Sequence, residues 1–209
     1  SRPEGAKKGP PMSSIILASQ SPRRRQLLSQ IGVTDFSLLA PQADESYDPA
    51  LSPEEIVSSI CRRKAEAARL LADDPQALII AADTMVFLDS LRLGKPHSEQ
   101  EAFRMLTSLS GRTHHVRTGL TLCRGARLET RVETTAVTFR PLTDGEKWSY
   151  IRTGDPMDKA GAYGVQGKAA LFVTGIQGDY FNVMGLPLCL LGRMLADFGV
   201  ELFSGEVEA

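Results

Sequence analysis

Residues 15–28 read Ile15-Ile16-Leu17-Ala18-Ser19-Gln20-Ser21-Pro22-Arg23-Arg24-Arg25-Gln26-Leu27-Leu28. The pattern predicts a short buried strand, a turn rich in hydroxyl groups and a helix, because Pro22 follows a serine that can cap the first free amides. Three arginines in a first helical turn are unusual, since the helix dipole favours anions at that end. A bound phosphate group would explain them, held by serine hydroxyls, free amides and guanidinium groups. A solvated arginine face on an exposed helix is the alternative that this stretch leaves open.

The composition limits the classes of protein to which the chain can belong. Its 209 residues are 42% hydrophobic, which is enough for one sizeable core in a single α/β domain or in two joined lobes. A net charge of −1 argues against a stable nucleic-acid partner. Cys61, Cys123 and Cys189 are odd in number and widely spaced, which indicates a reducing, cytoplasmic setting. The apolar run at 14–18 is too short to span a membrane, so no membrane association is expected.

The two ends of the chain differ from the rest. Residues 1–12 are rich in Gly, Pro and Lys and are expected to form a disordered leader. Met12 is a candidate start of the natural chain, a point that the sequence leaves open. We expect one domain over residues 13–203 and a tail over 204–209.

Capping patterns and alternation predict most of the helices and strands. Ser52, Ser98 and Thr143 are each followed three residues later by glutamate, which predicts that a helix begins at each of them. Strands are expected at 36–40, at 77–82, at 85–88, in a hairpin over 113–123 and 127–139, and at 170–174. A turn at 178–180 and a helix over 186–198 complete the chain.

Asp83 is the acid that stands out most. It follows the apolar run 77–82, which predicts a strand covered on both faces, and a buried carboxylate there needs a cation or hydrogen-bond donors. We therefore favour a functional role for Asp83 over a structural one. Asp44 and Glu45 form a pair in a loop after a strand, where α/β proteins bind ligands, although loop carboxylates are more often solvated.

Two lysines are candidate ligands for an anion. Lys64 follows Ile60 by four residues and so shares the apolar face of the helix expected over 53–71; it either extends to the rim or reaches into a cleft. Lys95 lies in a tight loop fixed by Pro96, which suits a positioned ammonium group. Cations and acids on short loops indicate a polyphosphate bound with a divalent cation, and oxygen ligands favour Mg²⁺ or Mn²⁺ over Zn²⁺.

Other patterns narrow the chemistry further. The glycine-rich stretch 158–167 predicts a close-fitting loop where the backbone approaches a ligand. His114 and His115 are adjacent in a strand and point to opposite faces, so we interpret them, with His97, as structural or surface residues. The pattern G-x-x-x-x-G-K-[ST] is absent, which argues against a P-loop nucleotidase. Covalent catalysis by Asp83 is disfavoured, because no second aspartate follows two residues later.

From residue 14 to 198 the sequence resembles the Maf-like nucleoside triphosphate pyrophosphatases. The resemblance rests on motifs in the same order, at 17–24, 44–45, 64–65, 82–84, 94–96, 109–114, 158–167 and 178–180. It implies an α/β fold related to the inosine-triphosphatase-like proteins, with an elongated twisted mixed sheet flanked by helices and two lobes around a cleft. It also implies a homodimer.

The resemblance implies hydrolysis of a nucleoside triphosphate between the α- and β-phosphates, with a divalent metal cation, to the monophosphate and pyrophosphate. The motifs at 82–84 and 162–167 resemble the branch that acts on dTTP and UTP. The functional positions of the family match here at Ser19, Arg23, Arg24, Glu45, Lys64, Asp83, Lys95 and Gln166. One departure is Lys168-Ala169, where the family often has Leu-Gly, and it adds a cation beside the loop that would contact the base.

Each matched position has an expected role. The triphosphate would be bound and oriented by Ser19, Arg23, Arg24, Lys64 and Lys95. Glu45 and Asp83 would hold the metal, and Asp83 either acts as general base or only orients the attacking water. Thr84 and Gln166 would read the pyrimidine, because a glutamine amide offers both a donor and an acceptor. Arg25 is expected at the surface.

Two other functions stay open. One is a non-catalytic regulator that senses nucleotides and acts in cell division, since the resemblance carries an association with septum formation. The other is a purine pyrophosphatase of the inosine-triphosphatase type. The leading hypothesis is an enzyme that removes excess or non-canonical pyrimidine triphosphates from the nucleotide pool.

Overall fold

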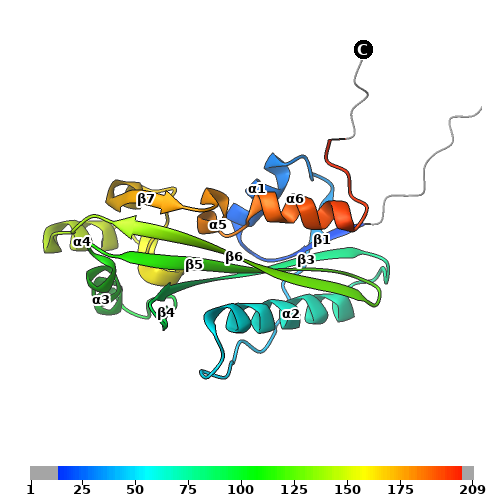
Figure 1. Cartoon of the computed structure of the whole chain (residues 1–209), viewed down its shortest axis with the longest axis horizontal. Coiled ribbons are helices and arrows are strands. Elements are labelled where there is room, and N and C mark those ends of the chain that lie inside the picture. Colours follow the sequence, from blue (N-terminus) through cyan, green and yellow to red (C-terminus); the bar gives the residue numbers. More distant parts are fainter. Residues whose placement is uncertain (1–13, 204–209) are drawn as a thin grey trace, which may run out of the picture.

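The computed structural model describes residues 14–203, which form a long sheet with helices on both faces (Figure 1). The leader expected over 1–12 and the tail over 204–209 lie outside the described residues. The strands are β1 (Ile15–Ala18), β2 (Phe36–Leu38), β3 (Leu78–Leu88), β4 (Leu91–Leu93), β5 (Thr113–Arg124), β6 (Arg127–Phe139) and β7 (Val173–Gln177). The helices are α1 (Pro22–Gln30), α2 (Pro53–Leu71), α3 (Glu99–Leu109), α4 (Asp144–Ile151), α5 (Tyr180–Met184) and α6 (Leu188–Asp197).

The sheet has the order β2-β1-β3-β5-β6-β7, and the short strand β4 pairs with β3. β1 runs parallel to both of its neighbours, whereas the other pairings are antiparallel. The sheet is therefore mixed, as the resemblance implied. The predicted hairpin over 113–139 is confirmed as β5 and β6. Their pairing runs without interruption from the pair Thr113–Thr138 to the pair Arg124–Arg127.

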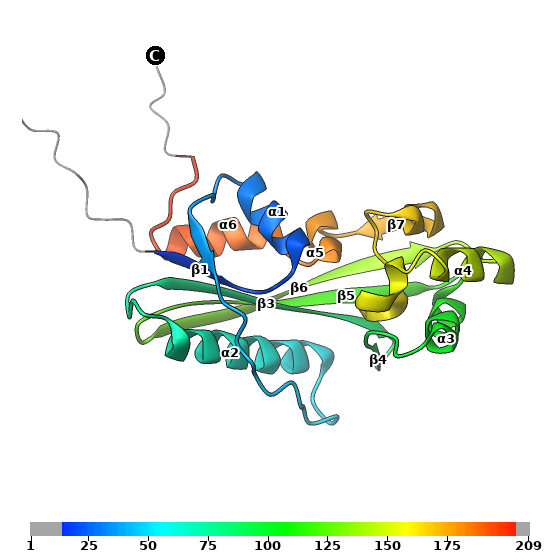
Figure 2. The same ribbon diagram turned by 180° about the vertical axis from the view of Figure 1, so that it is seen from behind.

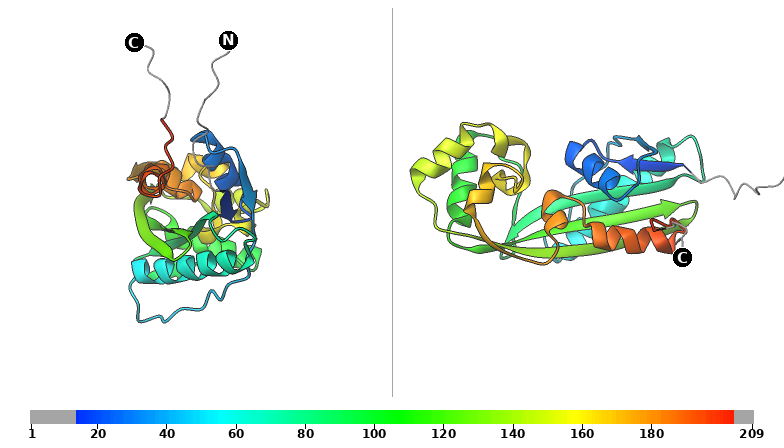
Figure 3. Two further views of the ribbon diagram at one scale, coloured as in Figure 1. Left: turned by 90° about the vertical axis from the view of Figure 1, so that its right-hand side faces the viewer. Right: turned by 90° about the horizontal axis from the view of Figure 1, so that it is seen from above.

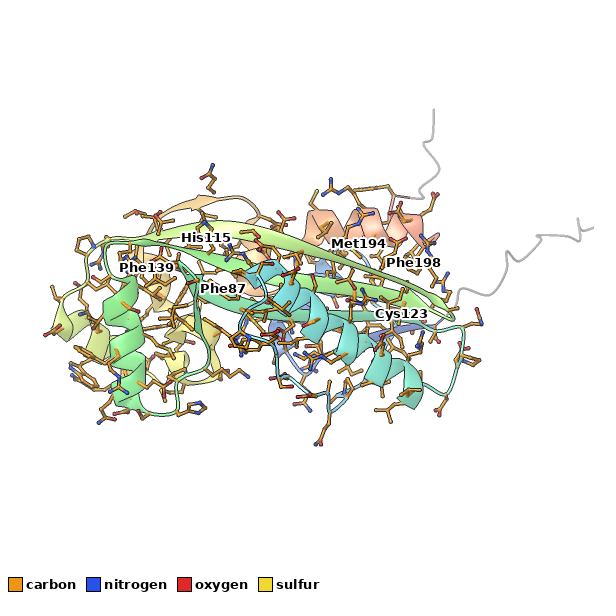
Figure 4. All side chains as sticks on the ribbon, turned by 60° about the horizontal axis from the view of Figure 1, so that its bottom comes forward. Phe87, His115, Cys123, Phe139, Met194 and Phe198 are labelled. Atoms are coloured by element: carbon orange, nitrogen blue, oxygen red, sulfur yellow. The ribbon has the colours of Figure 1, made fainter. Side chains whose placement is uncertain are left out.

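The helices cover both faces of the sheet and one of its ends. α2 covers one face, and α1, α5 and α6 lie over the other face (Figures 1 and 2). α3 and α4 lie at the far end of the sheet, so the molecule is elongated and has two groups of helices (Figure 3). Met194 of α6 and Phe198 after it are buried against the sheet (Figure 4). None of the described helices combines the length and the apolar character needed to cross a bilayer.

The predicted helix starts are confirmed by their caps. Ser52 Oγ accepts the Glu55 N–H over 3.2 Å, and the Glu55 carboxylate accepts the Ser52 N–H over 2.8 Å. Thr143 caps α4 by the same reciprocal arrangement. Ser98 caps α3, but the side chain of Glu101 accepts the N–H of His97, one residue earlier than in a capping box.

Three expectations about local structure were wrong. The two apolar runs at 77–82 and 85–88 form one continuous strand, so Asp83 lies in the middle of β3 and not at the end of a strand. The strand expected at 170–174 lies at 173–177, because residues 168–172 form a 3₁₀ turn. The turn expected at 178–180 opens the short helix α5, which Asp179 caps through two backbone N–H groups.

Candidate functional site

A cleft lies along an open stretch of one edge of β3. β5 pairs with one edge of this strand, while β1 and β4 share the other. The β1 pairing ends at Ala81 and the β4 pairing begins at Val86, so within the described chain residues 82–85 lack a strand partner there. Side chains around this gap line a cavity of about 820 Å³. A neighbouring cavity of about 560 Å³ shares Arg23, Lys64 and Lys95 with it, so the two form one cleft.

Every residue predicted for the site lines this cleft. Ser19 lines the smaller cavity, whereas the larger one is lined by Arg23, Arg24, Glu45, Lys64, Asp83, Thr84, Lys95 and Gln166. Arg25, which was expected at the surface, is exposed and lines neither cavity. Residues that are far apart in the sequence are therefore brought together.

Lys64 joins the two candidate acids. Its Nζ lies 2.6 Å from Asp83 Oδ1 and 3.2 Å from Glu45 Oε1. The Asp83 side chain is only 12% exposed, and its Oδ2 atom is buried without a hydrogen-bond partner in the described chain. Of the two alternatives for Lys64, the structure supports the one that reaches into a cleft. One Asp83 oxygen is neutralised by the lysine, and the other keeps its lone pairs free.

A glycine on the neighbouring strand sets how closely α2 approaches Asp83. Gly119 of β5 lies directly opposite Asp83 in the sheet. A Cβ atom at this position would lie 2.7 Å from the carbonyl oxygen of Val57 and 3.0 Å from Cβ of Cys61, both on α2. Only glycine allows this contact, which brings Lys64 within reach of Asp83.

Arg24 is held by hydrogen bonds to three parts of the chain. Its Nε donates to the Gly185 carbonyl over 2.7 Å, and its Nη2 donates to Thr84 Oγ1 over 2.9 Å. Its Nη1 lies 3.4 Å from Ser19 Oγ. Burial lowers the pKa of the guanidinium from its ordinary value, and the nearby Asp83 opposes that effect. Thr84 also bonds Thr118 over 2.8 Å, so its expected contact with a base stays a prediction.

Three further cations line the cleft without an ion pair to any described acid: Arg23, Arg92 and Lys95. The guanidinium carbon of Arg92 lies 5.1 Å from the ring centre of Tyr47, and Arg92 Nε is buried without a hydrogen-bond partner in the described chain. The acids of the cleft are already paired with lysines. These cations therefore leave the cleft with an excess of positive charge, which suits a polyanion.

The glycine-rich stretch forms the wall opposite α1. Lys159 donates to the carboxylates of Asp155 and Asp158 over 2.8 and 3.0 Å. Burial would raise the pKa of the Asp155 carboxyl, but hydrogen bonds from Lys159 and Tyr150 hold it below its ordinary value. Gln166 is exposed and lines the cleft from this wall. The glycines of this stretch pack closely on Lys159 and Asp155 at the cleft, whereas the predicted approach of the backbone to a ligand stays a prediction.

Several lining residues were not foreseen from the sequence: Tyr47, Arg92, Asp155, Val183, Met184 and Gly185. Arg92 lies on a strand of three residues, too short to show a pattern. Met184 and Gly185 belong to the end of α5, in a stretch between the turn expected at 178–180 and the helix expected over 186–198, where no element was predicted. The apolar spacing after the Asp179 cap was the one signal that could have indicated this helix.

A divalent cation would have two protein carboxylates available. Glu45 and Asp83 line the same cavity, and no group of three His, Cys, Asp or Glu side chains in the described residues is arranged to hold a metal. The buried, unpartnered Asp83 Oδ2 is an acceptor that suits a hard cation such as Mg²⁺ or Mn²⁺. The set fits a cation that shares its coordination with the oxygens of a bound ligand.

Comparison with known proteins places the chain among enzymes of nucleotide metabolism. It is 50% identical over 189 residues to a dTTP/UTP pyrophosphatase of Geobacillus sp., covering 90% of this chain and 100% of that protein. It is 47% identical over 187 residues to a dTTP/UTP pyrophosphatase of Bacillus velezensis, with 90% and 97% covered. A solved HAM1 protein from Coxiella burnetii aligns with 89% of this chain and 100% of its own, with 14% identity and a TM-score of 0.49.

The family model described as Maf-like protein matches residues 14–198, a range that contains every cleft residue named above. Six of the eight sequence motifs that suggested this family contribute residues to the cleft, whereas those at 109–114 and 178–180 lie outside its lining. The chain belongs to the Maf-like protein family.

Proposed function

We propose that this chain hydrolyses dTTP, UTP and related pyrimidine nucleoside triphosphates to the nucleoside monophosphate and pyrophosphate. The observation that carries the proposal is the contact of Lys64 with Asp83 at 2.6 Å, inside a cleft whose other cations include three without an ion pair to a described acid. Such a cleft combines a carboxylate that can accept a proton with groups that neutralise phosphate oxygens. The names of the similar proteins support pyrimidine triphosphates as the substrate class.

The reaction places a water molecule against the α-phosphorus. The water oxygen forms a bond to this phosphorus, the bond to the oxygen bridging the α- and β-phosphates breaks, and pyrophosphate leaves. Asp83 accepts the proton of the water, because it is a carboxylate that lines the cleft and is held in place there by Lys64. The ammonium group of Lys64 keeps both Asp83 and Glu45 in place.

The phosphates are bound by the cations of the cleft that form no ion pair with an acid in the described chain. Arg23, Arg92 and Lys95 contribute positive charge from three separate segments, and Arg23 lies in the first turn of α1, where free N–H groups also favour an anion. Arg24 is fixed by Thr84 and Gly185, so its remaining N–H groups have a set direction. Binding groups that are held before the substrate arrives lower the entropy cost of orienting it.

Glu45 and Asp83 would hold a Mg²⁺ or Mn²⁺ ion together with phosphate oxygens, and the ion would supply further neutralisation of the phosphate charge. Gln166 reads the pyrimidine, since its amide can donate to and accept from the base edge. The resemblance also implies a homodimer, which sedimentation of the purified protein would test.

A panel of dTTP, UTP, CTP and ITP, assayed for pyrophosphate release with Mg²⁺, tests the proposal. We expect turnover of dTTP and UTP at rates well above that of ITP. Faster turnover of ITP would favour the purine pyrophosphatase. Tight nucleotide binding without release of pyrophosphate would favour the regulator.

A further inference from the structure

The turn that carries Gln166 is held at both ends by side chains outside the predicted site. The Gly167 N–H donates to the Gly164 carbonyl over 3.2 Å and closes the turn. Val165 is buried, whereas Gln166 is exposed and lines the cleft. The tip of the turn therefore presents the Gln166 side chain to the cleft. The position of that side chain depends on where the two ends are fixed.

Tyr150 of α4 fixes the first end. Its hydroxyl accepts the Gly164 N–H over 3.0 Å and donates to Asp155 Oδ2 over 2.5 Å. The tyrosine is 3% exposed and belongs to a helix whose start is fixed by a capping box. One buried hydroxyl thus uses both its donor and its acceptor to join helix, acid and turn.

Asp155 and Lys159 pack against the two glycines of the turn. Lys159 Nζ donates to both the Asp155 carboxylate and the Asp155 carbonyl over 2.8 Å. A Cβ atom at Gly164 would lie 2.5 Å from Cε of Lys159, and one at Gly167 would lie 3.1 Å from Oδ2 of Asp155. Both glycines therefore pack directly on this pair, and a side chain at Gly164 would push the turn away from Lys159.

We infer that Tyr150 is a positioning residue for base recognition, whose hydroxyl sets the place of Gln166 against a pyrimidine. This inference rests on the proposed function, because it takes the base as the partner of Gln166. The edge of a uracil or thymine presents carbonyl oxygens beside the N3–H group, so it needs a donor and an acceptor at a fixed position. Removing the hydroxyl of Tyr150 frees the Gly164 end of the turn and leaves the cations of the cleft in place.

Tyr150→Phe is the variant that tests this, with Tyr180→Phe as the matched control. Tyr180 is 41% exposed and does not line the cleft. In Tyr150→Phe we expect the ratio of kcat/KM for UTP to that for ITP to fall at least about tenfold, the loss typical of one specific hydrogen bond. Calorimetric titration should show weaker UMP binding by a similar factor and pyrophosphate binding that changes by less than about twofold. The control should match the unmodified chain.

Two results would overturn the inference. One is a Tyr150→Phe protein with the UTP to ITP ratio and UMP affinity of the control, and the other is an equal weakening of UMP and pyrophosphate binding. If Tyr150→Phe does not fold, Asp155→Asn takes its place, because a neutral amide no longer forms an ion pair with Lys159. The selectivity for UTP over ITP should fall in this variant too. Unchanged selectivity would overturn the inference. If the unmodified chain hydrolyses no triphosphate, the proposed function fails, whereas the UMP and pyrophosphate titrations still decide the role of Tyr150.

Discussion

Arg24 Nη2 lies 2.9 Å from Thr84 Oγ1, which joins the first turn of α1 to the middle of β3. The same guanidinium reaches the carbonyl of Gly185 at the end of α5. Three elements that are distant in the sequence therefore meet at one arginine. The hydroxyl of Thr84 also bonds Thr118, so its capacity for hydrogen bonds is largely used within the protein.

Thr84→Val should lower kcat/KM about tenfold, because one N–H of Arg24 loses its partner, a loss of about 1–3 kcal/mol. We expect the activities on UTP and ITP to fall by the same factor, since the hydroxyl acts through Arg24. Thr84→Ser keeps the hydroxyl and should retain most of the activity. A selective loss with UTP in steady-state kinetics would contradict this and support a direct contact of Thr84 with the base.

Asp83→Asn should separate stability from activity. Replacing the carboxylate removes the proton acceptor, so kcat should fall about 10²- to 10⁴-fold while KM changes little. The midpoint of thermal unfolding should change little, because the amide oxygen can still accept from Lys64 Nζ, which also keeps Glu45 as its charged partner. Pyrophosphate release and calorimetry measure the two effects. Full activity in this variant would exclude Asp83 as the base.

The parts of the site that follow local patterns were predictable from the sequence. The helical spacing of Lys64 from Ile60 left two alternatives open, the rim or a cleft. The family resemblance favoured the cleft, and the structure places Lys64 2.6 Å from Asp83. The arginines after Ser21 stood out because cations are unfavourable in a first helical turn without an anion, and the family resemblance then separated Arg23 and Arg24 from Arg25. Helix starts followed in the same way from their caps, since capping depends on residues only three positions apart.

The parts that depend on distant contacts were not predictable. Arg92 faces Tyr47 only because β4 folds back on β3 beside the loop that follows β2. Tyr150 meets Gly164 across two 3₁₀ turns, a contact that no spacing in the sequence announces. Asp83 was assigned to a strand end because a polar pair interrupts the apolar run. The strand continues through it, since Asp83 finds Lys64 and Thr84 finds Arg24 as partners.

Gly119→Ala should weaken both fold and activity. Its Cβ atom would lie 2.7 Å from the carbonyl oxygen of Val57, so α2 must move away from the sheet. We expect a loss of about 1–3 kcal/mol in the free energy of unfolding and a fall in kcat, because Lys64 then lies farther from Asp83. Gly175→Ala is the control, since a Cβ atom there meets nothing within 4 Å. Equal stabilities of the two variants in urea unfolding would contradict the close contact.

Arg23 and Arg25 form a matched pair of neighbouring arginines. Arg23 lines the cleft without an ion pair to a described acid, whereas Arg25 is exposed and outside the cleft. Arg23→Met should raise KM for UTP about tenfold or more, because a charge-assisted contact with phosphate is lost. Arg25→Met should change KM by less than about twofold. Equal effects of the two substitutions would show that only the net charge matters.

The stability of the fold should decrease in mild acid because of His114. This residue is fully buried, its Nε2 lies 2.6 Å from the Tyr163 hydroxyl, and burial lowers its pKa from 6.5 to about 4, with a smaller contribution from His115. The unfolded chain therefore binds a proton between these two values that the folded chain does not. The free energy of unfolding therefore decreases as the pH falls from 6.5 toward 4, by up to about 3 kcal/mol, and this loss is absent above pH 6.5.

Urea unfolding at a series of pH values measures this loss, and His114→Gln should remove most of the slope between pH 6.5 and 4. His97 is exposed, so His97→Gln should leave the slope unchanged and serves as the control. An unaltered slope in His114→Gln would place the proton uptake on other groups. Because His114 holds Tyr163, which lines the cleft, the same proton should also weaken UMP binding in this pH range.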